Sequence, residues 1–265
     1  MISDKVFNNI RQFIYDQAGI KLSEEKRALV VGRLAKRLRS LNIDSYDDYW
    51  AYLTTSKDRK ELQHLVDVLT TNETRFFREP RHFELLQNVA KTAPVAQPLR
   101  VWCAASSTGQ EPYSIGMVLG AYLRSSWDMV ASDINLTVLA KARSALYLME
   151  AVDQIPDEFR YKYLLQGVRE KDGYFLVDGK IRQHINFVKV NLIHDKPDIG
   201  HFDIIFLRNV LIYFDRKTIE LVINKMVDYL NDGGYLFIGH SENIRGINKQ
   251  LELVEPTVYR KLNNG

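Results

Sequence analysis

Two helices near the start of the chain each carry an apolar stripe in which apolar residues recur at steps of three and four. This spacing is typical of a helix that buries one face. Two further helices are expected from Asp44 and over residues 61–69, and no strand pattern interrupts them. Residues 1–85 are therefore predicted to form a small all-α domain. The stripe residues are Phe7, Ile10, Phe13 and Ile14 in the first helix and Leu29, Val30, Leu34, Leu38 and Leu41 in the second.

From residue 86 onward, short apolar runs alternate with helical stretches, which predicts right-handed crossovers and a parallel sheet. Residues 251–254 and 258–260 then flank Glu255-Pro256 and predict an antiparallel pair of strands. Five parallel strands that end in such a pair are the plan of class I methyltransferases, whereas an NAD-binding Rossmann domain does not ordinarily end this way. The five runs are Leu99–Cys103, Trp127–Asp133, Phe187–Val190, Phe202–Leu207 and Tyr235–Ile238.

The alternation is interrupted between about residues 153 and 186. Tyr174–Val177, the turn residues Asp178-Gly179, and then Ile181 and Ile185 predict a small antiparallel hairpin. The predicted fold is thus α/β and Rossmann-like, with a mostly parallel sheet and a C-terminal antiparallel pair. We expect the all-α domain over residues 1–85, the methyltransferase domain over 86–265, and a β-subdomain inserted at about 153–186.

Composition and charge narrow the possible classes of protein. The content of 26% charged and 46% hydrophobic residues is ordinary for a globular chain, and the net charge of +3 is too small to indicate a nucleic-acid binder. The single cysteine, Cys103, lies in an apolar strand and is expected to be a buried structural thiol. No apolar segment reaches the ~18 residues of a membrane span, and the N-terminus lacks a signal-peptide pattern. We expect a cytoplasmic monomer that does not insert into membranes.

The second helix is strongly basic. No acidic residue occurs between Lys26 and Ile43. Such a face is most often simply solvated, but unbalanced charge also steers encounter with a partner of opposite sign. We therefore expect a docking surface for an acidic partner, formed by Arg33, Lys36, Arg37 and Arg39.

Polar residues follow the predicted strands, at the edge where open α/β sheets bind ligands. Asp133 ends the second strand, 24 positions after Gly109, and a carboxylate there suits the two ribose hydroxyls of an adenosine. That signal fits NAD and S-adenosylmethionine equally. However, the turn Ala104–Gly109 holds one glycine rather than the GxGxxG of a pyrophosphate site, and Glu111 would repel a pyrophosphate while attracting an ammonium or sulfonium group. These features favour S-adenosylmethionine.

Five ordered motifs then carry a resemblance that covers nearly the whole chain. They are TTNETRFFREP, SSTGQEPYS, the strand end ASDI, VNL, and LRNVLIYFD. Together they resemble the CheR family, the chemotaxis receptor glutamate methyltransferases. The chain departs from the family pattern at Gln110, where a second Glu is usual; Glu111 keeps the charge.

The resemblance implies the site residues. Arg78 and Tyr213 are expected to face the transferred methyl group and the acceptor. The competing structural interpretations are an ion pair of Arg78 with Glu79 or Glu111, and a packed aromatic at Tyr213. The residues implied to contact S-adenosylmethionine are Asn72, Thr74, Arg78, Glu111, Asp133, Asn191, Leu192, Arg208 and Asn209.

The chemistry of that family agrees with the residues present. A glutamate side chain has a pKa near ~4.3, so the acceptor is already ionised at neutral pH and no general base is needed. No histidine or cysteine stands out as a base, and no metal site is expected. The implied partner is the cytoplasmic helical bundle of methyl-accepting chemoreceptors, and the implied product is S-adenosylhomocysteine. Two alternatives remain: a class I methyltransferase with another acceptor, and a cofactor-binding regulator without turnover.

Overall fold

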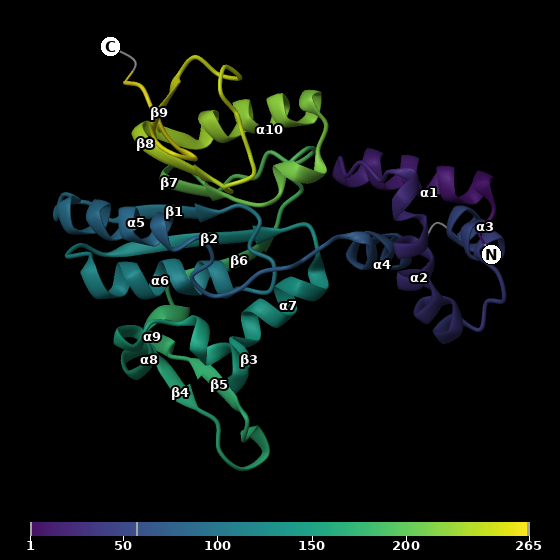
Figure 1. Ribbon diagram of the computed structural model, residues 1–265, viewed down its shortest axis with the longest axis horizontal. Helices are drawn as coiled ribbons and strands as arrows, with labels where there is room; N and C mark the ends of the chain where they lie inside the picture. The colour runs from purple at the N-terminus through teal and green to yellow at the C-terminus, as the bar shows by residue number, and fades with distance from the viewer. Residues whose placement is uncertain (1, 57, 264–265) are drawn as a thin grey trace.

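The computed structural model describes residues 2–56 and 58–263 (Figure 1). Its N-terminal part is helical, as predicted, and the two apolar stripes, apart from Leu29, pack together into one core. The first helix begins where the Ser3 hydroxyl accepts the Val6 N–H, and it ends at Gly19, whose φ is 66°. The helices are α1 (Asp4–Ala18), α2 (Arg27–Leu41), α3 (Tyr46–Ser56) and α4 (Arg59–Leu69), with a 3-10 turn at Glu24–Lys26.

A seven-stranded sheet forms the larger part of the molecule, in the order β6-β2-β1-β7-β8-β10-β9. The first five strands of this order pair in parallel, and β10 pairs antiparallel with both β8 and β9. The predicted parallel core and its antiparallel end are thus confirmed. The strands are β1 (Leu99–Cys103), β2 (Trp127–Asp133), β6 (Ile185–Lys189), β7 (Phe202–Leu207), β8 (Leu230–Ile238), β9 (Leu251–Glu255) and β10 (Val258–Lys261).

Helices cover both faces of this sheet, which is why its central strands are apolar on both sides. In β1, Val101 and Cys103 face the core beneath α5 and α6, whereas Trp102 faces the core beneath α10. Figure 1 shows α6 and α10 on opposite sides of the sheet. The helices that follow or precede strands are α5 (Pro80–Thr92), α6 (Gln110–Tyr122), α7 (Leu136–Ser144) and α10 (Arg216–Tyr229). No helix of the described residues is long and apolar enough to cross a membrane.

The boundary between the two parts lies before α5. Phe83 and Leu86 of this helix are buried in the same core as Tyr113 and Ile115 of α6. A division at residue 85 would cut through α5. The helical part instead ends with α4, and residues 70–79 connect it to the sheet.

The inserted β-subdomain contains a three-stranded antiparallel sheet in the order β3-β5-β4. It begins at residue 146, earlier than expected. The predicted hairpin across Asp178-Gly179 is wrong, because the Asp178 carboxylate accepts the Lys180 N–H and starts a short helix, while Ile185 pairs with Met129 in the main sheet. Its elements are β3 (Leu146–Leu148), α8 (Asp157–Tyr163), β4 (Leu164–Gln166), β5 (Tyr174–Val177) and α9 (Gly179–Arg182), with 3-10 turns at Met149–Gln154 and Arg169–Lys171.

Candidate functional site

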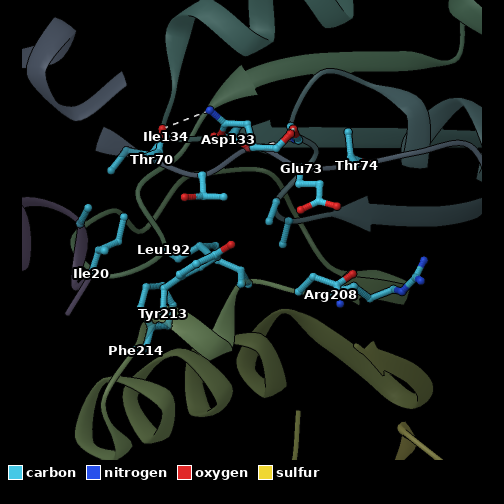
Figure 2. A pocket seen from close by; sticks show the side chains of 18 of the residues that line it. Ile20, Thr70, Glu73, Thr74, Asp133, Ile134, Leu192, Arg208, Tyr213 and Phe214 are labelled. Carbon is cyan, nitrogen blue, oxygen red and sulfur yellow. Dashed lines mark hydrogen bonds between the residues drawn. The ribbon is translucent and has the colours of Figure 1, made fainter. Parts of the chain in front are cut away.

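A pocket lies where the helical domain meets the carboxyl ends of the sheet strands. Its empty volume is about 870 Å³, including its open mouth. Ala18 and Ile20 from the helical part contribute to its wall, and Figure 2 shows Asp133 and Tyr213 on opposite sides of it. All ten residues predicted for cofactor and acceptor line this one pocket: Asn72, Thr74, Arg78, Glu111, Asp133, Asn191, Leu192, Arg208, Asn209 and Tyr213.

The Asp133 carboxylate is held in place by backbone groups at the end of β2. Its Oδ2 accepts the Ser107 N–H at 2.9 Å and its Oδ1 accepts the Asn135 N–H at 2.9 Å. Burial raises the pKa of Asp133, and these two hydrogen bonds oppose the rise. A carboxylate fixed in this way has further lone pairs for ligand hydroxyls.

The turn between β1 and α6 brings its backbone close to this carboxylate. Gly109 has φ +98°, and a Cβ there would lie 2.6 Å from the Tyr147 hydroxyl, so this position requires glycine. The Ser107 hydroxyl donates to the Asn72 carbonyl at 2.9 Å and thereby joins the turn to the segment that leaves the helical domain. Sequence reasoning missed Ser107, which lies inside a motif but carries no charge.

Arg208 forms ion pairs with Glu79 and Glu111, the two carboxylates that the sequence analysis named as possible partners of Arg78. Its guanidinium is fully buried; Nη1 donates to Glu111 at 2.7 Å, and Nη2 lies 3.0 Å from a Glu79 oxygen. Nη2 also donates to the Arg78 carbonyl at 2.6 Å. The Arg78 side chain itself donates to the Glu73 carbonyl at 3.1 Å and lines the pocket without an ion pair to Glu79 or Glu111. Arg78 therefore has its charge available to a ligand.

Cys103 is buried, as expected, and its thiol donates to Glu111 at 3.3 Å. Burial and the nearby Glu111 carboxylate raise the pKa of this thiol well above its ordinary value. The thiol is therefore not a nucleophile at neutral pH.

A buried carboxylate organises the loop that follows β7. Glu242 accepts the N–H groups of Asn209, Leu211 and Gly239 at 3.0, 2.7 and 2.6 Å. Burial raises the pKa of Glu242 despite these bonds. The arrangement keeps Asn209 at φ 56°, a conformation that asparagine tolerates better than most residues. Glu242 lies in the GHSE segment, which sequence reasoning did not connect with the site.

Two residues of the pocket also join the domains. The Asn191 side chain donates to the Gln17 carbonyl at 2.6 Å, and the Tyr213 carbonyl accepts the Lys21 N–H at 2.9 Å. The Tyr213 ring is half-buried, and burial raises its pKa above the usual value. Tyr213 therefore remains a neutral hydroxyl at physiological pH. Its packing role and its place in the pocket are compatible, because the ring contacts the helical core and also lines the cavity.

The four predicted docking residues on α2 divide into two pairs. Arg33 donates to the carbonyls of Leu69 and Thr70 at 2.9 and 3.0 Å, and Arg37 forms an ion pair with the buried Glu61. Lys36 and Arg39 are exposed. Arg33 and Arg37 therefore join α2 to the end of α4 within the helical domain.

Glu79, His82 and His240 come close enough together to suggest a metal site. The Glu79 oxygen that faces the His82 Nδ1 at 3.5 Å also faces the Arg208 guanidinium at 3.0 Å. Because this guanidinium already supplies a positive charge there, we interpret the cluster as a polar network.

Comparison with known proteins agrees with this geometry. Residues 5–70 match the all-alpha domain of the CheR methyltransferases, and residues 72–260 match their SAM-binding domain. This chain belongs to the CheR methyltransferase family. It is 38% identical to the chemotaxis protein methyltransferase of Salmonella typhimurium over 97% of this chain and 90% of that protein. It is 39% identical to that of Escherichia coli (97% and 91% covered) and 40% identical to chemotaxis protein methyltransferase 2 of Pseudomonas aeruginosa (96% and 91%).

The protein is thus an S-adenosylmethionine-dependent methyltransferase. The site fits this cofactor, because the pocket combines a fixed carboxylate at the end of β2 with a second carboxylate, Glu111, at the start of α6. The two domain matches meet at about residue 71, which agrees with the end of α4. Ala18, Ile20, Ile134 and Phe214 also line the pocket; sequence reasoning missed them because their apolar side chains look like ordinary core.

Proposed function

We propose that this enzyme transfers the methyl group of S-adenosylmethionine to glutamate side chains of methyl-accepting chemoreceptors, giving glutamate methyl esters. Relatives that align over most of their length are named chemotaxis protein methyltransferases. The observation that supports the acceptor is the pocket wall: Arg78 and Tyr213 lie beside the cofactor residues, and no histidine or cysteine lines the pocket among the described residues. A carboxylate acceptor fits such a wall, because it is already ionised at neutral pH, needs no base, and is attracted by a cation.

In the proposed placement, Asp133 binds the ribose hydroxyls and Glu111 binds the α-ammonium group of the cofactor. Both carboxylates are already held by neighbouring groups, so little reorganisation accompanies binding. The remaining contacts are assigned by the family resemblance to Asn72, Thr74, Arg78, Asn191, Leu192, Arg208 and Asn209.

The cofactor supplies a methyl group bonded to a positively charged sulfur. A carboxylate oxygen of the acceptor forms the new bond to the methyl carbon as the carbon–sulfur bond breaks. The electron pair of the broken carbon–sulfur bond stays on sulfur. No proton moves. The task of the protein is therefore to orient the acceptor carboxylate toward the methyl group and to exclude water. Arg78 holds the acceptor carboxylate with its planar guanidinium, and the Tyr213 ring closes the other side of the pocket.

For docking, we propose that Lys36 and Arg39 on the exposed side of α2 contact the acidic surface of the receptor's cytoplasmic helical bundle. The receptor would then contact the same helical domain whose Ala18 and Ile20 contribute to the pocket wall. We expect the protein to act as a cytoplasmic monomer and to bind neither nucleic acid nor membrane.

The test is a transfer assay with methyl-labelled S-adenosylmethionine and receptor cytoplasmic fragments. We expect label that is released as methanol by base, and we expect its loss when the receptor glutamates are replaced by alanine. Arg78→Ala should lower the rate at least about 10-fold, whereas Arg75→Ala, an exposed neighbour outside the pocket wall, should not. Transfer to other proteins but not to receptors would favour a different acceptor. Cofactor binding without transfer to any acceptor would favour the regulator.

A further inference from the structure

The Arg208 guanidinium is buried and shared between two carboxylates. Nη1 lies 2.7 Å from Glu111 and Nη2 lies 3.0 Å from Glu79, whose side chains are only 10% and 11% exposed. The adjacent His82 is neutral, because burial lowers its pKa to about 3. These three charged groups, two carboxylates and one guanidinium, therefore carry a net charge of −1 beside the pocket.

Glu79 organises the pocket without being part of its wall. Its second carboxylate oxygen accepts the Asn209 side-chain N–H at 3.2 Å and the His240 N–H at 3.3 Å. The same residue has φ 61° and ψ 70°, a backbone conformation unfavourable for a side chain of this size. A strained backbone conformation of this kind persists where contacts with the surrounding structure hold the residue in position. Here the side chain contacts two consecutive residues of the pocket wall, Arg208 and Asn209.

The charges explain what Glu79 contributes. If Glu79 were neutral, Arg208 would have Glu111 as its only carboxylate partner, and the net charge of the group would be zero. Glu111 would then attract a cationic ligand group less strongly. Because the Arg208 side chain is fully buried, water screens these interactions little.

We propose that Glu79 is a positioning residue for the amino-acid end of the cofactor: it holds Arg208 and Asn209 in place and leaves Glu111 with negative charge for the α-ammonium group. The proposal rests on the cofactor placement given above, in which Glu111 binds that group. Glu79 touches neither the cofactor nor the acceptor and acts through Arg208.

Two ligands separate this role from general support of the fold. S-adenosylhomocysteine carries the amino-acid end, whereas 5′-methylthioadenosine has the same adenosine and thioether but lacks it. By calorimetric titration of the Glu79→Gln variant, we expect about 10-fold weaker binding of S-adenosylhomocysteine and unchanged binding of 5′-methylthioadenosine. The matched control is Glu84→Gln, an exposed glutamate on α5, the helix that follows Glu79. This substitution should change the affinity for neither ligand. Equal weakening of both ligands, or no weakening of either, would overturn the proposal.

The route through Arg208 is tested by a double-mutant cycle. In a Glu111→Gln background, Glu79→Gln should cause little further loss of S-adenosylhomocysteine affinity. The Glu111 carboxylate, whose negative charge Glu79 is proposed to preserve, is already absent there. Independent, additive losses would contradict the proposal. If Glu79→Gln does not fold, Glu79→Asp serves instead: the shorter side chain withdraws from Arg208, and the same difference between the two ligands is expected. None of these titrations contains a receptor, so they do not depend on the proposed acceptor.

Discussion

At the scale of single residues, one basic helix contains side chains with two different tasks. Arg33 and Arg37 turn their guanidinium groups toward α4, where they meet carbonyl oxygens and the carboxylate of Glu61. Lys36 and Arg39, in the same helix, are exposed. Reversing the charge of all the arginines together would therefore disturb the fold and the proposed receptor contact at once. Single substitutions separate the two.

We predict that Arg33→Gln weakens cofactor binding. Its guanidinium bonds the carbonyls at the end of α4 and the Thr71 hydroxyl, directly before Asn72 and Thr74 of the pocket. Losing these bonds frees that segment, so S-adenosylhomocysteine should bind several-fold more weakly in calorimetry, with Tm lowered by a few degrees. Lys36→Gln should leave both quantities unchanged and lower only the rate of receptor methylation. If the two variants behave alike in cofactor binding, the assignment is wrong.

At the scale of elements, a helix of one domain caps a helix of the other. The Asp67 carboxylate, on α4, accepts the N–H groups of Leu136 and Thr137 at 3.2 and 3.0 Å and the Thr137 hydroxyl at 2.8 Å. It therefore fixes the start of α7, three residues after Asp133. The domain interface and Asp133, the carboxylate proposed to bind the ribose, are thus parts of one connected structure.

Asp67→Ala should cost about 1 kcal/mol of unfolding free energy, as for loss of a helix cap, and should also weaken S-adenosylhomocysteine binding. The matched control is Asp58→Ala. Asp58 caps its own helix by accepting the Lys60 and Glu61 N–H groups, within one domain. Its loss should lower stability by a similar amount in urea unfolding and leave cofactor affinity intact. Equal effects on affinity would show that the interface cap has no special influence on the pocket.

At the scale of the whole molecule, the sequence predicted the features that depend on the hydrophobic pattern within one continuous stretch of chain. The five parallel strands were predicted from their continuous apolar runs, and Asp133 was predicted as a ligand residue because strand ends gather at one edge of a parallel sheet. The family resemblance, rather than the pattern, implied the other pocket residues. The hairpin at Asp178-Gly179 was wrong because Asp-Gly signals both a tight turn and a helix start, and tertiary packing decides between them. The pairing of Arg208 with both Glu79 and Glu111 could not be predicted, since it joins three segments far apart in the chain.

The polar network that joins α5 to the end of the sheet predicts how the whole fold responds to acid. His82 is 2% exposed, and its Nε2 lies 2.9 Å from the Thr257 hydroxyl between β9 and β10. The charged or titratable groups that face it are Glu79, Arg208 and His240. Burial first, and then Arg208, lower the pKa of His82 to about 3, despite the opposing Glu79 carboxylate.

Below its ordinary pKa of ~6.5, His82 binds a proton in the unfolded chain but not in the folded one, so unfolding becomes easier as the pH falls, by up to about 1.4 kcal/mol per unit. In urea unfolding between pH 7.5 and 5, the stability of the wild type relative to His82→Gln should therefore fall, by roughly 2 kcal/mol in all. The same comparison with His201→Gln shows what removing an exposed histidine does over this pH range. A difference between wild type and His82→Gln that stays constant with pH would mean that His82 titrates in the folded protein as it does in the unfolded chain.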